Sequence, residues 1–468
     1  MSRPARIVAL LVLVEFGSGI LQGGFPVLLP DLADRLRLGA ADQSLATGLE
    51  FLVSGIAVPV TSRLGDLLGH RRWLRITLVL TFAGFLLTAL AQSLPVLLAG
   101  RALAGFLACW LPLEFAIVRD ALGPDRGGRA VGLLVGSLTL GSIVGAVAVG
   151  LPGTDGGGLR PLLYGLAVLP LLGLLLVSRG VPESGTRARG AIDWQGAALL
   201  SLGLGLLFGS VSGAGLGAAG VLGLLAGAVL LLGLFVRHEL RAVSPLLDLR
   251  VLAGRATAPV FALSFLLGCV LYGAQSATLS FQAADPARAG YGLDADSGLL
   301  GLLTLPAVAG ALLGSLTAHR LGRRFGERAV LTAAFAAGAA GYGAITLHHT
   351  GAAAFVLPSL IAGYGGGLGL SLLPALLMRR LPAEHTGVGT GVYNTLKTLA
   401  GAATGAAGAA VLDTMLLRAD VPLEGAYVTV WASCAVLSAV GVPVALALRG
   451  AGRTRGRGAA AEPVAEAA

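Results

Sequence analysis

The sequence predicts an all-α polytopic membrane protein, and three observations lead to that fold class. Apolar residues make up 55% of the chain and charged residues 12%, about half the charged fraction of a soluble domain. Apolar runs long enough to cross hydrocarbon follow one another along most of the chain. Basic residues gather in alternate connections between these runs, as they do in inserted membrane proteins.

Fourteen runs are long enough to cross about 30 Å of hydrocarbon as helices. They lie near 7–29, 44–61, 74–93, 95–118, 130–151, 160–178, 195–213, 217–236, 257–281, 296–318, 329–347, 353–377, 388–411 and 427–448. Many of the 72 glycines fall inside these runs, where small residues let helices approach closely. Arg3 and Arg6 precede the first run as in a secretory signal, but without a clear cleavage site we expect this helix to be retained.

The distribution of basic residues predicts the orientation. With the N-terminus in the cytosol, cytosolic segments hold 26 of the 33 basic residues, and Arg101 and Lys397 lie inside runs. The external segments hold Arg35, Arg37, Arg160, Arg288 and Arg418. This asymmetry predicts that both termini are cytosolic and that the number of spans is even.

A short motif after the second run is repeated in the second half. Leu64-Gly65-Asp66-x-x-Gly69-x-Arg71 returns 257 residues later as Leu321-Gly322-Arg323-x-x-Gly326-x-Arg328. Such an echo is typical of transporters built from repeated bundles. It pairs the first six spans with the last six and leaves two spans between them.

The domain organisation follows from that pairing. We expect an N-terminal six-helix bundle over 1–180 and a linker with two inserted helices over 181–255. A C-terminal six-helix bundle over 256–450 and a disordered cytosolic tail over 451–468 complete the chain.

The elbow that continues to Arg72 resembles the loop between helices 2 and 3 of the major facilitator superfamily, with the pattern Gly-x-Leu-x-Asp-Arg-x-Gly-Arg-Arg. Ser62 and Leu67 depart from that pattern. Fourteen spans with a central insert resemble the drug:proton antiporter branch, known from multidrug and quaternary-ammonium exporters. Further local matches are Asp193-Trp194-x-Gly196, Pro245-Leu246-Leu247-Asp248 and Asn394-Thr395-x-Lys397-x-x-x-Gly401. The resemblance implies a major facilitator fold in the plasma or inner membrane. It also implies a conformational gate formed by Gly65, Asp66, Gly69, Arg71, Arg323, Gly326 and Arg328.

The fifth span carries part of the glycine motif that marks exporters in this branch. Gly132, Gly141 and Gly145 have the family spacing, and the resemblance implies that they pack helices closely. Ala146 replaces the proline that normally follows, which weakens the assignment of direction. The acid that branch members often carry in the first span would fall at Leu21, so proton coupling is carried differently here or is absent.

Five charged residues lie inside the spans, where a charge costs several kcal/mol unless it faces protein or a watery cavity. They are the candidates for proton coupling or for lining the cavity: Glu15, Glu50, Arg101, Glu114 and Lys397. Their depths predict two pairs, Glu50 with Arg101 and Glu15 with Lys397. We expect Glu114 to reach toward the cytosol beside Arg119.

Other classes of function find little support. Lys397 is the only lysine, so a phosphate-binding loop is missing, and His348-His349 have no partner ligands nearby. The three cysteines lie inside spans without metal-ligand spacing, and we expect no cofactor, metal or nucleic-acid partner and no enzymatic activity. The sequence therefore favours a monomeric, proton-coupled exporter of amphipathic compounds. The alternatives are an importer or facilitator of a small polar metabolite and a non-transporting membrane protein.

Overall fold

The fold is a bundle of long helices. The computed structural model describes residues 3–150, 158–183, 191–211, 217–242, 245–246, 254, 257–380, 386–418 and 421–448. The first half holds α1 (Arg3–Leu36), α2 (Ala40–Leu68), α3 (His70–Leu90), α4 (Leu94–Ala104), the 3₁₀ helix η1 (Gly105–Cys109), α5 (Trp110–Gly150) and α6 (Leu159–Gly180). Next come α7 (Trp194–Val211) and α8 (Ala218–Glu239). The second half holds α10 (Ala258–Tyr272), α11 (Gln275–Ala283), α12 (Pro286–Ala289), α13 (Ser297–Phe325), α14 (Glu327–Leu347), α15 (Ala353–Arg380), α16 (Thr386–Thr414) and α17 (Glu424–Leu446).

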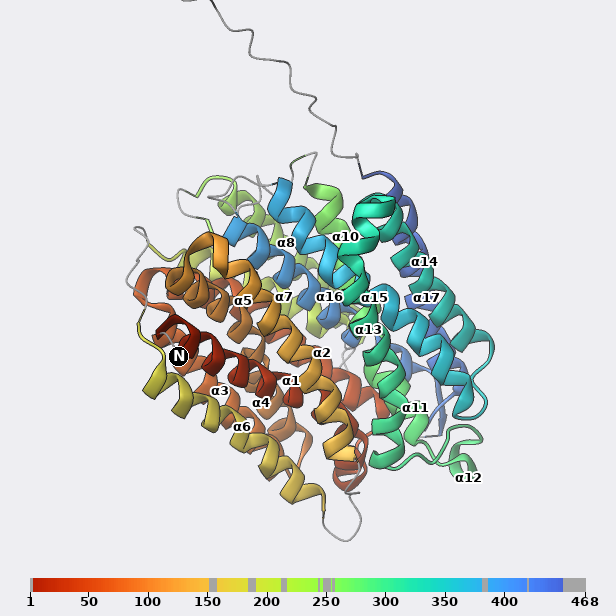
Figure 1. The fold of residues 1–468 in the computed structure, drawn as a ribbon. Helices are drawn as coiled ribbons and strands as arrows, with labels where there is room; N and C mark the ends of the chain where they lie inside the picture. The colour runs from red at the N-terminus through yellow and green to blue at the C-terminus, as the bar shows by residue number, and fades with distance from the viewer. Residues whose placement is uncertain are drawn as a thin grey trace, which may run out of the picture.

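Apart from α2, α11 and α16, the helices of each half pack mainly on one another. In Figure 1, α1–α6 lie together on one side and α10–α17 on the other, each group with its own buried apolar core. Between α16 and α17 the strands β1 (Leu416–Arg418) and β2 (Val421–Pro422) form a small antiparallel hairpin. The predicted domain boundaries stay predictions, and the predicted tail at 451–468 lies outside the described residues.

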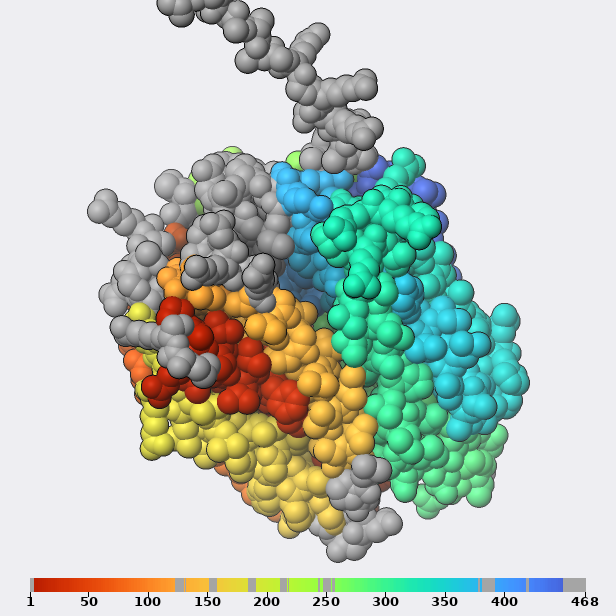
Figure 2. Space-filling model, in the orientation of Figure 1, coloured from red at the N-terminus to blue at the C-terminus, as the bar shows by residue number. Residues whose placement is uncertain are grey.

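Two helix pairs join the halves. The surface of α5 lies directly beside that of α13 (Figure 2), and α2 packs along α16. A side chain at Gly301 would come within 2.6 Å of the Ala146 carbonyl, and one at Gly405 within 2.8 Å of the Gly48 Cα. Glycine at these positions therefore lets the backbones of the two halves touch.

The two halves repeat each other in structure as they do in sequence. α2 and α13 both have 29 residues, and the helices that follow them, α3 and α14, both have 21. Gly69 and Gly326 lie between them with φ of 109° and 84°, a region that glycine adopts without strain. The Gly69 N–H donates to the Gly65 carbonyl, as the Gly326 N–H does to that of Gly322. The predicted internal repeat is confirmed at this elbow.

Twelve helices of the described residues are long and apolar enough to cross a membrane, so the predicted count of fourteen is not confirmed. The difference lies in α7, whose apolar part is short, and in α16. α16 has 29 residues, but it is rich in Ala, Gly and Thr and carries Lys397. Because α2 and α10 pack on it, protein covers much of its surface, and its sequence needs less hydropathy than a lipid-facing helix.

The spans predicted at 95–118 and 130–151 correspond to two of these candidate spans, Leu94–Leu122 and Gly132–Gly150, but the connection between them is helical. The 3₁₀ helix η1 interrupts the first of them, and α5 then runs for 41 residues through the predicted connection into the second. Gly123, Pro124, Gly127 and Gly128 lie in this connection and favour a loop, yet the backbone there is helical.

Candidate functional site

Glu50 on α2 and Arg101 on α4 form an ion pair inside the first bundle. Arg101 is buried, and 17% of the Glu50 side chain is exposed. The Arg101 guanidinium carbon also lies 3.6 Å from the centre of the Phe25 ring and 5.3 Å from that of Phe85. One carboxylate and two aromatic faces therefore hold this buried cation. The structure brings together the two residues that the sequence paired by depth.

Gly105 lets α2 approach the chain close to this ion pair. A Cβ there would lie 2.6 Å from the Glu50 carbonyl oxygen, so any side chain would push α2 away. The Ser54 hydroxyl lies 2.8 Å from the Gly105 carbonyl and satisfies it where α4 gives way to η1. Gly105 lies about one helical turn after Arg101. The same stretch of chain therefore carries the buried cation and lets α2 come close enough to place Glu50 beside it.

Glu15 on α1 lies against Glu114 on α5, and both side chains are fully buried. Their carboxyl groups are within hydrogen-bonding reach of each other, and the Ser18 hydroxyl is within reach of Glu15. The prediction that Glu114 reaches toward the cytosol is wrong. The sequence missed this pair because two acids attract each other only when one of them holds a proton.

Lys397 does not join Glu15. Its ammonium group lies 5.7 Å from the centre of the Tyr393 ring on the same helix, and its side chain is half-buried. Its backbone carbonyl approaches α10 so closely that a Cβ at Gly268 would lie 2.2 Å from it. In the described part of the chain no ion pair links Lys397 to an acid. The predicted Glu15–Lys397 pair is therefore wrong, and Lys397 remains a cation on the second bundle.

At the first elbow, Asp66 accepts a hydrogen bond from the buried ring of His70 over 3.0 Å and is 42% exposed. The Arg71 side chain donates to the Ser178 carbonyl at the end of α6. The backbone N–H groups of Arg71 and Arg72 both donate to Glu183. Glu183 thus caps the start of α3, a contact that the sequence reading missed because 112 residues separate Glu183 from Arg71.

At the second elbow, Arg323 and Arg328 are exposed, as is Gly326. The ion pair there joins two residues outside the predicted set, Glu327 at the start of α14 and Arg379 at the end of α15. The acid at the start of α14 complements the positive end of the helix dipole. The two elbows share their glycines but bind different partners.

The three glycines of the fifth-span motif have different surroundings. A Cβ at Gly141 would lie 2.2 Å from the Phe16 carbonyl, and one at Gly145 2.4 Å from that of Ile20. Both glycines therefore allow contact between the backbones of α5 and α1. A Cβ at Gly132 would have nothing within 4 Å, so this position packs against no other helix.

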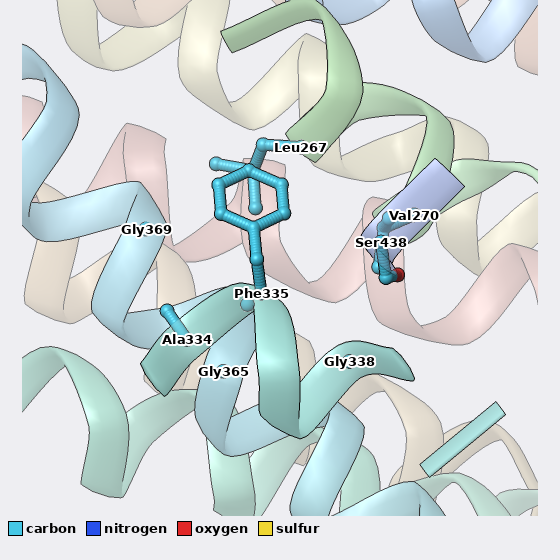
Figure 3. Close-up of a pocket in the computed structure, with 9 residues that line it drawn as sticks. Leu267, Val270, Ala334, Phe335, Gly338, Gly365, Gly369 and Ser438 are labelled. Atoms are coloured by element: carbon cyan, nitrogen blue, oxygen red, sulfur yellow. The ribbon is translucent and has the colours of Figure 1, made fainter. Parts of the chain in front are cut away.

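Figure 3 shows a pocket between α10, α14, α15 and α17. Its lining is apolar apart from the Ser438 hydroxyl: Leu267, Val270, Ala334, Phe335, Gly338, Gly365, Gly366, Gly369 and Ser438. None of the charged candidates lies there. The pocket offers packing but no charge, so we do not assign the substrate site to it.

Two bundles of apolar helices that carry buried charges are the architecture found in membrane transporters built from repeated halves. The sequence profile of the Major Facilitator Superfamily matches residues 11–405. The chain belongs to this superfamily and is a multi-pass membrane protein. The family and the solved structures described below consist of transporters rather than enzymes.

Several relatives resemble the chain in sequence. It is 27% identical to multidrug resistance protein Stp of Mycobacterium tuberculosis over 83% of this chain and 73% of that protein. It is 29% identical to the uridine/deoxyuridine transporter of Lactococcus lactis, over 69% and 70% respectively. An uncharacterized MFS-type transporter of Mycobacterium tuberculosis is also 29% identical, over 67% of this chain. The matched region spans 45% of that relative, which is less than half of its length.

Solved structures show the same fold at low identity. The nucleoside transporter NupG superposes with a TM-score of 0.63 at 15% identity, over 96% of this chain and 99% of that one. The peptide transporter POT superposes with a TM-score of 0.65 at 17% identity, over 94% of each chain.

Proposed function

We propose that this protein is a secondary transporter that exports amphipathic, drug-like or antibiotic compounds in exchange for protons by alternating access. One observation carries the proposal: four charged side chains lie inside the first bundle and one on the second, and charges at membrane depth mark ion or substrate pathways. These are Glu15, Glu50, Arg101, Glu114 and Lys397. The similarity to multidrug resistance protein Stp supports this substrate class.

We further propose that α7 and α16 also cross the membrane, which gives fourteen spans with both termini in the cytosol of a cell-membrane protein. The five-to-one excess of basic residues on one side supports this orientation. The burial of α16 between α2 and α10 supports a crossing position for it. In that orientation the elbows at Gly69 and Gly326 face the cytosol.

Uptake of a small polar metabolite is the second candidate function. The relative named a uridine/deoxyuridine transporter is as similar as the multidrug proteins are. Ala146, at the place of the exporter motif's proline, also favours it. The buried acids fit either direction, because a proton can drive uptake as well as export.

Transport measurements distinguish the two functions. Everted vesicles with an acidified lumen should accumulate ethidium, and a protonophore should abolish the accumulation. Glu15→Gln should abolish this uphill transport while exchange of ethidium down its own gradient survives. Glu424→Gln, a change in a half-exposed pair with His349, serves as the control that retains transport. No ethidium accumulation, together with proton-dependent uptake of labelled uridine by whole cells, would overturn export in favour of import.

A further inference from the structure

The buried carboxyl groups of Glu15 and Glu114 have too few hydrogen-bond donors around them for two negative charges. Within the described part of the chain, Glu15 Oε2 and both carboxyl oxygens of Glu114 lack a donor. Two adjacent carboxylates without protein donors at these oxygens would repel each other, and burial would weaken their hydration. One proton between them supplies a donor, which turns the repulsion into a hydrogen bond.

The charges around this pair do not neutralise it. α1 packs on α2, α5 and α6 and, across the seam, on α11 and α13. Glu114 is the acid that faces Glu15 from α5. On α2, Glu50 is held by Arg101. Further charged or titratable side chains on the helices that pack on α1 or α5 include Arg63 and Asp66 on α2, His70, Arg71, Arg72 and Arg75 on α3, Arg119 on α5, Arg179 on α6 and Arg320 on α13, while α11 has no charged residue. Among the described residues none of them forms an ion pair with Glu15 or Glu114.

A ladder of polar side chains leads from this pair along α1. The Gln22 amide donates to the Ser18 hydroxyl over 3.1 Å, and that hydroxyl is within hydrogen-bonding reach of Glu15. Glu15, Ser18 and Gln22 are spaced by three and four residues, so they share one face of the helix. Ser18 is buried, whereas Gln22 is exposed. The ladder therefore joins the buried acids to an accessible polar group.

The exposed end of this ladder points into the molecule rather than to lipid. Leu13, which is 56% exposed, marks the outer side of α1. Gln22 follows it by nine residues, which is two and a half turns at 3.6 residues per turn, so it lies on the opposite side. That side faces the second half of the molecule, where α11 and α13 contact α1.

We propose that Glu15 and Glu114 form one proton site, in which two carboxyl groups share a single proton that enters and leaves through Ser18 and Gln22. The use of this proton to drive transport rests on the proposed function. Glu50 has a different part, because Arg101 holds it as an ion pair. The site lies between α1 and the first turns of α5.

Infrared difference spectra of the purified full chain in lipid nanodiscs test the shared proton without any substrate. The titration of the parent protein minus that of E15Q/E114Q, which retains all the other acids, should show near neutral pH the carbonyl stretch of one carboxylic acid per protein. Each single variant, Glu15→Gln or Glu114→Gln, should shift the pH midpoint of the band from the remaining acid. Glu50→Gln should leave the band unchanged. Two carboxylic acids per protein, none, or unshifted midpoints in the single variants would overturn the shared site.

The route has its own test. After transfer to D₂O, the band should shift several-fold more slowly in Ser18→Ala than in the parent protein. Ser142→Ala is the matched control, because this serine lies on α5 and its hydroxyl only donates to the Leu138 carbonyl. Equal exchange rates in the two variants would overturn the route.

Ethidium transport then separates this inference from the proposed function. If the parent protein does not move ethidium but the band behaves as expected, the proton site stands and drug export fails. If the parent protein accumulates ethidium against a gradient and E15Q/E114Q does so equally, the shared proton is not the coupling proton and the proposed role fails while export stands.

Discussion

Among individual residues, the sequence identified the charged groups inside the membrane but only part of their pairing. Opposite charges at equal depth placed Glu50 with Arg101, because depth follows directly from position in a span. The rotation of each helix about its axis is not visible in the same way. Glu114 was expected to extend toward water, yet it is fully buried against Glu15. Packing of like charges could be predicted only by assuming a bound proton.

The Glu50–Arg101 pair leads to a prediction about stability. Glu50→Gln leaves Arg101 as a buried cation with aromatic partners only, and removing one partner of a buried pair costs about 3–5 kcal/mol. We expect the lower end of that range because Glu50 is partly exposed. The variant should therefore lose monodisperse protein at a clearly lower temperature in size-exclusion chromatography after heating.

Two further variants check this interpretation of the pair. E50Q/R101Q should recover part of the loss, since neither charge then stays buried alone. Glu424→Gln breaks a half-exposed pair with His349 and should change little, because exposed pairs contribute about 0–1 kcal/mol. If Glu50→Gln and the parent protein lost monodisperse protein at the same temperature, this would contradict a stabilising role of the Glu50–Arg101 ion pair.

Among the helices, the sequence located the apolar runs well and their limits less well. The elbow at Gly69 and its copy at Gly326 were visible because glycine with positive φ leaves a clear signature. The continuation of the α5 helix through 119–129 was not visible, because Gly123, Pro124, Gly127 and Gly128 in that segment predict a loop. α16 shows the reverse difficulty, since a helix covered by protein does not need a strongly apolar sequence.

The glycines of α5 give a matched test of helix packing. Gly141→Leu should push α5 away from α1, because its Cβ would overlap the Phe16 carbonyl, and overpacking typically costs about 1–3 kcal/mol. Gly132→Leu adds the same side chain on the same helix where nothing lies within 4 Å. We expect a reduced yield of folded protein for Gly141→Leu and a normal yield for Gly132→Leu. Equal yields would show that α1 and α5 do not need this close contact.

For the whole molecule, the elbow at Gly69 and its copy at Gly326 are the predicted gate at which the two bundles move relative to each other. Asp66 is 42% exposed and bonded to His70, so it remains accessible to a partner in another state. Asp66→Asn should leave membrane insertion intact but slow ethidium transport sharply, because the carboxylate can no longer pair with a cation or a helix N-terminus. Initial rates per amount of inserted protein measure this effect.

The opposite end of α2 supplies the control for that variant. Asp42 accepts a hydrogen bond from the Gly39 N–H at the start of the same helix. Asp42→Asn should keep most of the transport rate, since it changes a local cap far from the elbow. Normal turnover in Asp66→Asn would reduce the motif to a loop that only sets the orientation of the protein.

The number of crossings predicts on which side of the membrane the later connections lie. With fourteen spans and a cytosolic N-terminus, positions 37, 160, 288, 348 and 418 are all external. If α7 and α16 did not cross, positions 288 and 348 would change to the cytosolic side while the other three stayed outside. The arginine distribution favours the first arrangement, because a cytosolic loop between α11 and α13 would contain only Arg288.

Single cysteines introduced at these positions decide between the two arrangements. Cys109, Cys269 and Cys434, which are buried, would first be replaced by alanine. A membrane-impermeant maleimide added to intact cells should label Arg288→Cys and His348→Cys as strongly as Arg37→Cys, which is external in both arrangements. His319→Cys, next to the second elbow, should react only after the cells are opened. Labelling of His319→Cys in intact cells, with protection of Arg288→Cys and His348→Cys, would overturn the fourteen-span arrangement, because only the parity of the spans between α6 and α13 exchanges these sides.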